Sequence, residues 1–167
     1  MNNSIIKKLP VALIAAAFLL SFTTVADKAN FSGSWKLNEG KSELGEFGRF
    51  VARKVKAEQK DDAITVSKTA ASFNGDDVTT TETLTFDGKT TETTVFGTAK
   101  RKSTAKWSED GKSLAISYSI DIERDGNTMT ITGTETWSLT DEGKLSLSTK
   151  SVSPQGERST KAVYDKE

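Results

Sequence analysis

The chain has 167 residues, enough for one domain, with 23 basic and 23 acidic side chains, no histidine and no cysteine. This balance gives no basic surface typical of binding to nucleic acid or to anionic lipid. The missing residue types exclude disulfides, a histidine general base and the commonest metal ligands. We therefore expect no metal, no cofactor and no catalytic residues, and an enzyme relying on a lone Asp or Glu is the alternative.

The first 26 residues have the pattern of a secretory signal. Lys7 and Lys8 precede an apolar run over residues 9–20, and the small residues Thr24 and Ala26 follow. The run is too short to span a membrane comfortably, although an uncleaved anchor is the alternative. Removing Lys7 and Lys8 leaves 21 basic against 23 acidic residues, a net charge of −2. We expect a periplasmic or secreted domain over residues 27–167, with no integral membrane segment after cleavage.

Residues 31–38 predict the first strand of a sheet. Phe31, Gly33, Trp35 and Leu37 alternate with polar residues, so they share one face of the strand. Gly33 lies on the apolar face, one pleat before a large indole ring. A glycine inside a strand weakens it unless a bulky group must come close there.

The rest of the chain predicts about eight to ten strands. After a glycine-rich segment over residues 39–50, read either as a lid with a helical turn or as an ordinary ordered loop, short alternating segments follow one another. Tight turns between nearly all neighbours favour an all-β, up-and-down antiparallel β-barrel over an open sandwich. The turn signals are Asn74-Gly75, Asp87-Gly88, Asp110-Gly111, Asp125-Gly126 and Glu142-Gly143.

The opening Phe31-x-Gly33-x-Trp35-x-Leu37 resembles the first-strand signature of lipocalins. Most of the chain after residue 26 is similar to the lipocalin-like domain proteins of bacterial envelopes, chiefly over residues 33–42, 135–139 and 163–166. The chain departs from the family because Thr140-Asp141 is followed by Glu142, so the Thr-Asp-Tyr motif is absent. The strand count comes closer to the ten-stranded fatty-acid-binding relatives.

The resemblance implies structural roles for three residues. In lipocalins the tryptophan closes one end of the barrel and a cation from the last strand lies across it. Trp35 is the matching tryptophan, with Gly33 making room beside it. Arg158 is the expected cation and Lys161 the second choice, unless Arg158 is simply a surface turn residue.

Four charged residues lie on otherwise apolar or small faces: Glu82, Arg101, Glu135 and Arg158. If these faces point inward, the charges must be paired, hydrated or offered to a ligand. The two arginines would then suit the carboxylate of an amphipathic ligand, and the two glutamates would pair with them in the empty protein. The alternative is that the strands slip out of strict alternation and these residues reach solvent.

The candidate ligand-binding residues are therefore Glu82, Arg101, Trp107, Tyr118, Glu135 and Trp137, where the aromatic side chains supply apolar walls. A packed core would use the same aromatic residues. We expect a lipocalin-like protein that binds a small hydrophobic or amphipathic molecule inside the barrel. The alternative is a non-enzymatic envelope module with a filled barrel and an unknown protein partner.

Overall fold

The computed structural model describes residues 27–167 except Phe73 and Asp125. The predicted signal segment, residues 1–26, lies outside the described residues. The described part of the chain forms two short 3-10 helices, η1 (Glu39–Lys41) and η2 (Gly45–Phe50), and ten strands. The strands are β1 (Gly33–Leu37), β2 (Lys54–Gln59), β3 (Ala63–Ala71), β4 (Asp77–Thr85), β5 (Thr91–Val95), β6 (Ala99–Trp107), β7 (Ser113–Arg124), β8 (Asn127–Leu139), β9 (Leu145–Ser153) and β10 (Gly156–Lys166).

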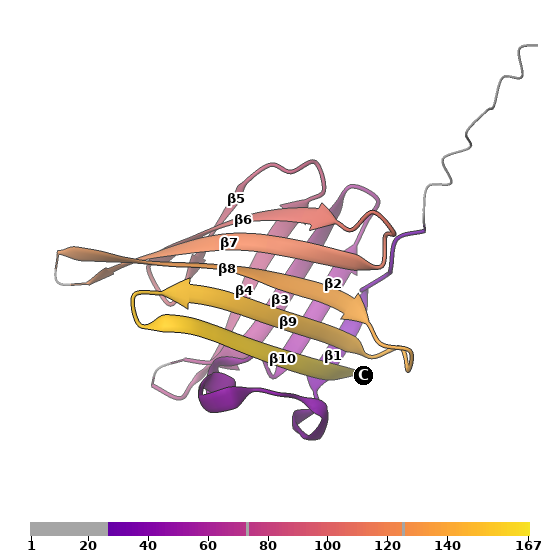
Figure 1. The fold of residues 1–167 in the computed structure, drawn as a ribbon, viewed down its shortest axis with the longest axis horizontal. Coiled ribbons are helices and arrows are strands. Elements are labelled where there is room, and N and C mark those ends of the chain that lie inside the picture. The colour runs from indigo at the N-terminus through magenta and orange to yellow at the C-terminus, as the bar shows by residue number, and fades with distance from the viewer. Residues whose placement is uncertain (1–26, 73, 125) are drawn as a thin grey trace, which may run out of the picture.

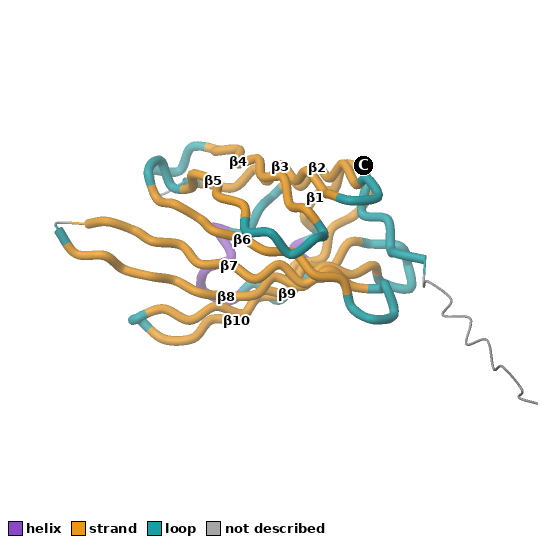
Figure 2. The backbone as a smooth tube through the Cα atoms, turned by 90° about the horizontal axis from the view of Figure 1, so that it is seen from above, coloured by secondary structure: helices purple, strands orange, loops and turns teal. Residues whose placement is uncertain are grey.

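The strands form one antiparallel sheet in the order β4-β3-β2-β1-β10-β9-β8-β7-β6-β5. Figure 1 shows β6–β10 in front, with β1–β4 crossing behind them, and Figure 2 shows the two layers from above. The first strand, β1, is hydrogen-bonded to the last strand, β10, whereas β4 and β5 are the two edges of the sheet. This confirms the predicted all-β, up-and-down antiparallel barrel, as a nearly closed one. No helix among the residues described is long and apolar enough to cross a membrane.

Alternation of apolar and polar residues explains why one face of each strand is buried. On β3, Ile64 and Val66 are buried, whereas Thr65 and Ser67, which alternate with them, are less so, and every strand that follows repeats this period in part. The predicted glycine turns at residues 74–75, 87–88, 110–111 and 142–143 also form, and Gly111 between β6 and β7 adopts a positive φ of 67°. The fifth, at 125–126, includes a residue outside the described ones. The inward faces meet in a core at the end of the barrel where the described chain begins.

The segment between β1 and β2 is an ordered connection that runs beside β10. Glu43 and Lys161 exchange two backbone hydrogen bonds, of 2.7 and 2.9 Å. The Asn38 side chain accepts a hydrogen bond of 3.1 Å from the backbone of Lys41 and so caps η1. Leu44 packs against the main core. The predicted helical turn is therefore present, and its role as a lid stays a prediction.

Candidate functional site

Aromatic side chains fill one end of the barrel. Phe31 stacks on Trp107 with ring centroids 5.6 Å apart and meets Trp137 edge-on at 5.7 Å. Phe86 contacts Trp107 at 5.4 Å, also edge-on. We call Phe31, Phe86, Trp107 and Trp137 the aromatic end cluster. Because Phe31 and Trp137 are fully buried, this end is packed rather than open.

Trp35 lies beside this cluster and is covered by a cation, but not by the expected one. Its Nε1 donates a 2.9 Å hydrogen bond to the carbonyl oxygen of Phe31. Lys166, its partner in the β1–β10 register, places its Nζ 5.5 Å from the Trp35 ring. A Cβ at Gly33 would come within 3.0 Å of the Lys166 side chain, so the glycine makes room for this contact.

The expectation that Arg158 covers Trp35 is wrong. Arg158 pairs with Ser151 near the opposite end of β10 and donates a 2.7 Å hydrogen bond to Gln155 in the adjoining turn. The second choice, Lys161, is exposed, and its backbone exchanges hydrogen bonds with the backbone of Glu43. The register of the last strand, which decides the partner, puts Lys166 opposite Trp35.

An ion pair spans the barrel interior next to the aromatic end cluster. Lys68 on β3 and Glu135 on β8 come from opposite walls, and the Lys68 Nζ lies 2.5 Å from a carboxylate oxygen of Glu135. The same oxygen accepts a 2.5 Å hydrogen bond from Nε1 of Trp137. The exposed fractions of the Lys68 and Glu135 side chains are 20% and 10%, so this pair is largely withdrawn from water.

A second acid and base lie farther along the same interior. Arg101 Nε is 3.5 Å from a carboxylate oxygen of Glu82 and donates a 3.0 Å hydrogen bond to the hydroxyl of Ser103. That hydroxyl donates in turn to Glu82 at 3.2 Å. This contact joins β6 to β4 across the open edge of the sheet. We call Lys68, Glu82, Arg101 and Glu135 the interior charge cluster.

Burial and charge act in opposite directions on Glu135. Burial alone would raise the pKa of its carboxyl group. The nearby charges of Lys68 and Arg101, with hydrogen bonds from Lys68 and Trp137, outweigh burial and hold the pKa below its ordinary value. The carboxyl group is therefore ionised at neutral pH, and it stays ionised because these partners are present.

This lowered pKa predicts an acid-dependent loss of stability. The unfolded chain protonates Glu135 near its ordinary pKa of 4.5, whereas the folded chain does so only at lower pH. The contribution of Glu135 is therefore complete above about pH 4.5 and is lost as the pH falls through the folded pKa. We expect Glu135→Gln to make the free energy of unfolding less sensitive to acid, measured by urea titrations across this range.

The control is Glu92→Gln, because Glu92 is exposed and forms a surface ion pair of 3.5 Å with Lys100. This variant should keep most of the acid sensitivity of the unmodified protein. An equal flattening by both substitutions would contradict the role assigned to Glu135.

Beyond the interior charge cluster the inner wall becomes apolar again. Val95, Ala99 and Ile120 are buried together, and the partly buried Tyr118, Ile122 and Ile131 pack against them. We call these six residues the rim cluster. Tyr118 joins it to the charges, because the Arg101 guanidinium lies 4.1 Å over its ring. Burial raises the pKa of the Tyr118 hydroxyl, although the charge of Arg101 opposes this.

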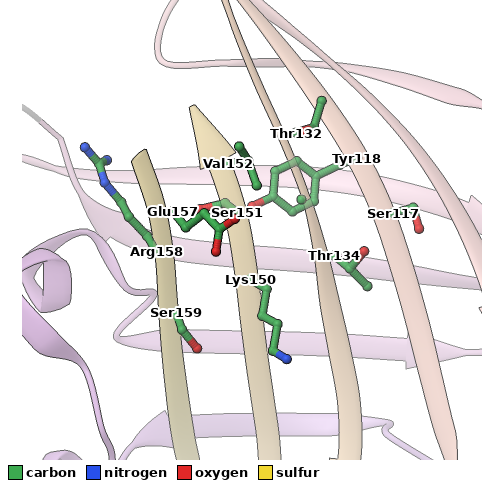
Figure 3. Close-up of a pocket in the computed structure, with 11 residues that line it drawn as sticks. Ser117, Tyr118, Thr132, Thr134, Lys150, Ser151, Val152, Glu157, Arg158 and Ser159 are labelled. Carbon is green, nitrogen blue, oxygen red and sulfur yellow. The ribbon is translucent and has the colours of Figure 1, made fainter. Parts of the chain in front are cut away.

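A separate hollow of about 700 Å³ lies on β7–β10 (Figure 3). Figure 3 shows the Arg158 side chain pointing away from the Tyr118 ring. Three rows of residues line the hollow, each row running across neighbouring strands. The inward row is Tyr118, Gly133, Ser151, Arg158, and the two outward rows are Ser117, Thr134, Lys150, Ser159 and Thr132, Val152, Glu157. Because most of the lining belongs to the two outward rows, the hollow lies mainly on the outer face of the barrel.

The structure brings most of the sequence-predicted site residues inside, but in two groups. Glu82, Arg101 and Glu135 lie in the interior charge cluster and Tyr118 contacts it, whereas Trp107 and Trp137 belong to the packed aromatic end. Sequence reasoning missed Lys68 and the bridging role of Ser103. Lys68 continues the alternation of Ile64 and Val66, which was the available signal. No group of three or more acidic side chains in the described ranges is placed to hold a metal ion.

Comparison with known proteins shows the fold and no closer relationship. No family model and no curated protein matches the sequence. The zebrafish ileal bile acid-binding protein, solved with cholic acid, matches with a TM-score of 0.53 and 19% identity over 82% of this chain and 98% of that one. A luciferase domain from the dinoflagellate Lingulodinium polyedrum matches with a TM-score of 0.51 and 8% identity, over 83% of this chain and 43% of that chain.

Both likenesses show the fold alone, an up-and-down β-barrel like the calycin type. They do not single out the lipocalins, so the closer resemblance to lipocalin-like envelope proteins stays a prediction. They also say nothing of chemistry, since fold alone does not carry function.

Proposed function

We propose that this protein binds a small amphipathic molecule in the barrel and acts as a binding protein rather than as an enzyme, in the periplasm or outside the cell. The observation that carries the proposal is the order of surfaces along the inner wall. A polar, charged site at Arg101 lies directly beside the apolar rim cluster, with Tyr118 belonging to both. An amphipathic molecule presents the same sequence of surfaces, a polar head joined to an apolar body.

Two further observations support this proposal. Nη2 of Arg101 is buried and has no hydrogen-bond partner among the described residues, although buried polar groups are usually satisfied. The zebrafish protein of similar fold is described as a bile acid-binding protein, and a bile acid is amphipathic. Because the aromatic end is packed, we place such a molecule at the rim cluster, in the other half of the barrel.

The test is a titration of the purified protein with N-phenyl-naphthylamine, an uncharged dye that fluoresces in apolar surroundings. We compare two substitutions of one kind: Ile131→Glu on the inner wall and Val152→Glu on the outer face, where Val152 is 51% exposed. Ile131→Glu should weaken dye binding by about tenfold or more, because a charge replaces a partly buried apolar contact. Val152→Glu should change it little.

Two results would contradict the proposal. Absence of dye binding, together with a solvent extract of the purified protein that contains no small molecule, would argue against a ligand in the barrel. Weaker binding in Val152→Glu but not in Ile131→Glu would move the site to the outer hollow, which is the second candidate because it also contains an apolar side chain.

A further inference from the structure

The interior charge cluster contains two cations and two anions, so its formal charge is zero. Lys68 pairs with Glu135 at 2.5 Å, and Arg101 pairs with Glu82 at 3.5 Å and through Ser103. The positive charge of Arg101 also acts on Glu135 and helps to keep its carboxyl group ionised. The positive charge of Arg101 is therefore already balanced inside the protein, before any ligand is considered.

A balanced site does not favour a ligand that brings a charge of its own. A carboxylate placed on Arg101 would lose its hydration and come close to Glu82 and Glu135, which repel it. Burying a charge costs free energy unless an opposite charge compensates it, and here the available cation, Arg101, is already paired.

The geometry of Arg101 leaves one kind of contact open. Its Nε is used by Ser103 and Glu82, and one face of the guanidinium lies against the Tyr118 ring. Nη2 is a buried donor with no partner among the described residues. An oxygen acceptor that carries no charge would satisfy this donor and leave the balance of the cluster unchanged.

We infer that the head group of the ligand is an uncharged hydrogen-bond acceptor, such as an amide, carbonyl or hydroxyl, held by Nη2 of Arg101, and that an ionised carboxylate is disfavoured. The inference rests on the proposed function, since it specifies the ligand of that same site. It also replaces the sequence-based expectation that Arg101 binds a carboxylate.

The test uses three probes with the same apolar chain: decanamide, decanol and decanoate, each displacing N-phenyl-naphthylamine near neutral pH. Decanamide and decanol should bind the unmodified protein about tenfold or more tightly than decanoate. Arg101→Gln should weaken decanamide by about 10- to 100-fold, as expected for loss of a charged donor. Its control is Lys102→Gln, which removes one cation from the exposed neighbouring position on β6 and should leave the affinities unchanged.

Glu82→Gln gives a second, opposite readout. It leaves the positive charge of Arg101 unbalanced, so decanoate should gain about tenfold or more relative to decanamide. The matched control is Glu92→Gln, because Glu92 pairs at 3.5 Å with Lys100 on the surface. Circular dichroism confirms folding, and if a variant does not fold, the order of affinities in the unmodified protein still decides the question.

The outcomes separate the inference from the proposed function. Tighter binding of decanoate than of decanamide by the unmodified protein overturns the inference and leaves the barrel as a binding site. Displacement by none of the three probes, together with no binding of the dye itself, overturns both. Unchanged selectivity in a folded Glu82→Gln protein also overturns the inference.

Discussion

Replacing Lys68 by Met is expected to lower the free energy of unfolding by about 3–5 kcal/mol, because it leaves the carboxylate of Glu135 buried without its cation. Glu135 is 8% exposed, so water cannot replace the lost partner. The measurement is a urea denaturation curve followed by tryptophan fluorescence, because Trp137 donates to Glu135 and reports on the same site.

Two companion variants isolate the cause. Lys150→Met removes a lysine from the exposed outer side of β9 and should change stability by a few tenths of a kcal/mol, roughly the range for surface positions. The double variant Lys68→Met with Glu135→Gln removes both charges and keeps an acceptor for Trp137, so it should be more stable than Lys68→Met alone. A double variant no more stable than the single one would show that lost packing, not the unpaired carboxylate, explains the effect.

Replacing Trp35 by Ala is expected to lower the free energy of unfolding by about 3–5 kcal/mol, the usual range for removing a large buried aromatic side chain. Trp35 is 2% exposed, and the substitution also removes the donor to the Phe31 carbonyl and the surface on which Lys166 lies. The same denaturation experiment measures the loss.

A comparison of two Trp→Phe variants tests the part played by the indole N–H. Trp35→Phe deprives the Phe31 carbonyl of a donor, whereas Nε1 of Trp107 is buried without a partner among the residues described. Trp107→Phe should therefore be much less destabilising than Trp35→Phe, because it removes a polar group that is already unsatisfied. Equal losses would contradict the role assigned to the hydrogen bond from Trp35 to Phe31.

The strands were predictable because a period of two survives in almost every segment. Leu114, Ile116, Tyr118 and Ile120 on β7 alternate with small or polar residues, and the structure turns this set inward. Glycine turns between neighbouring strands then leave few topologies other than an up-and-down barrel. Local spacing was sufficient because both the alternation and the turns are local properties.

The partners inside the barrel were not predictable from the same pattern. Alternation gives the face of a strand but not which residue lies across the lumen, and Lys68 meets Glu135 only because β3 and β8 form opposite walls. The cation over Trp35 depends on the β1–β10 register, which joins the first strand to the last. Such contacts connect residues far apart in the sequence, so pair geometry follows from the closed fold rather than from any one segment.

The edge between β4 and β5 has a consequence for how the barrel widens. Neighbouring strands elsewhere in the sheet separate only when backbone hydrogen bonds of the ladder break, but no ladder joins β4 to β5. Across this edge the interior contact from Glu82 to Arg101 and Ser103 is made by side chains alone. Opening the barrel there therefore disturbs the contact among Glu82, Arg101 and Ser103 before it disturbs any backbone ladder, so these three side chains set the resistance to widening.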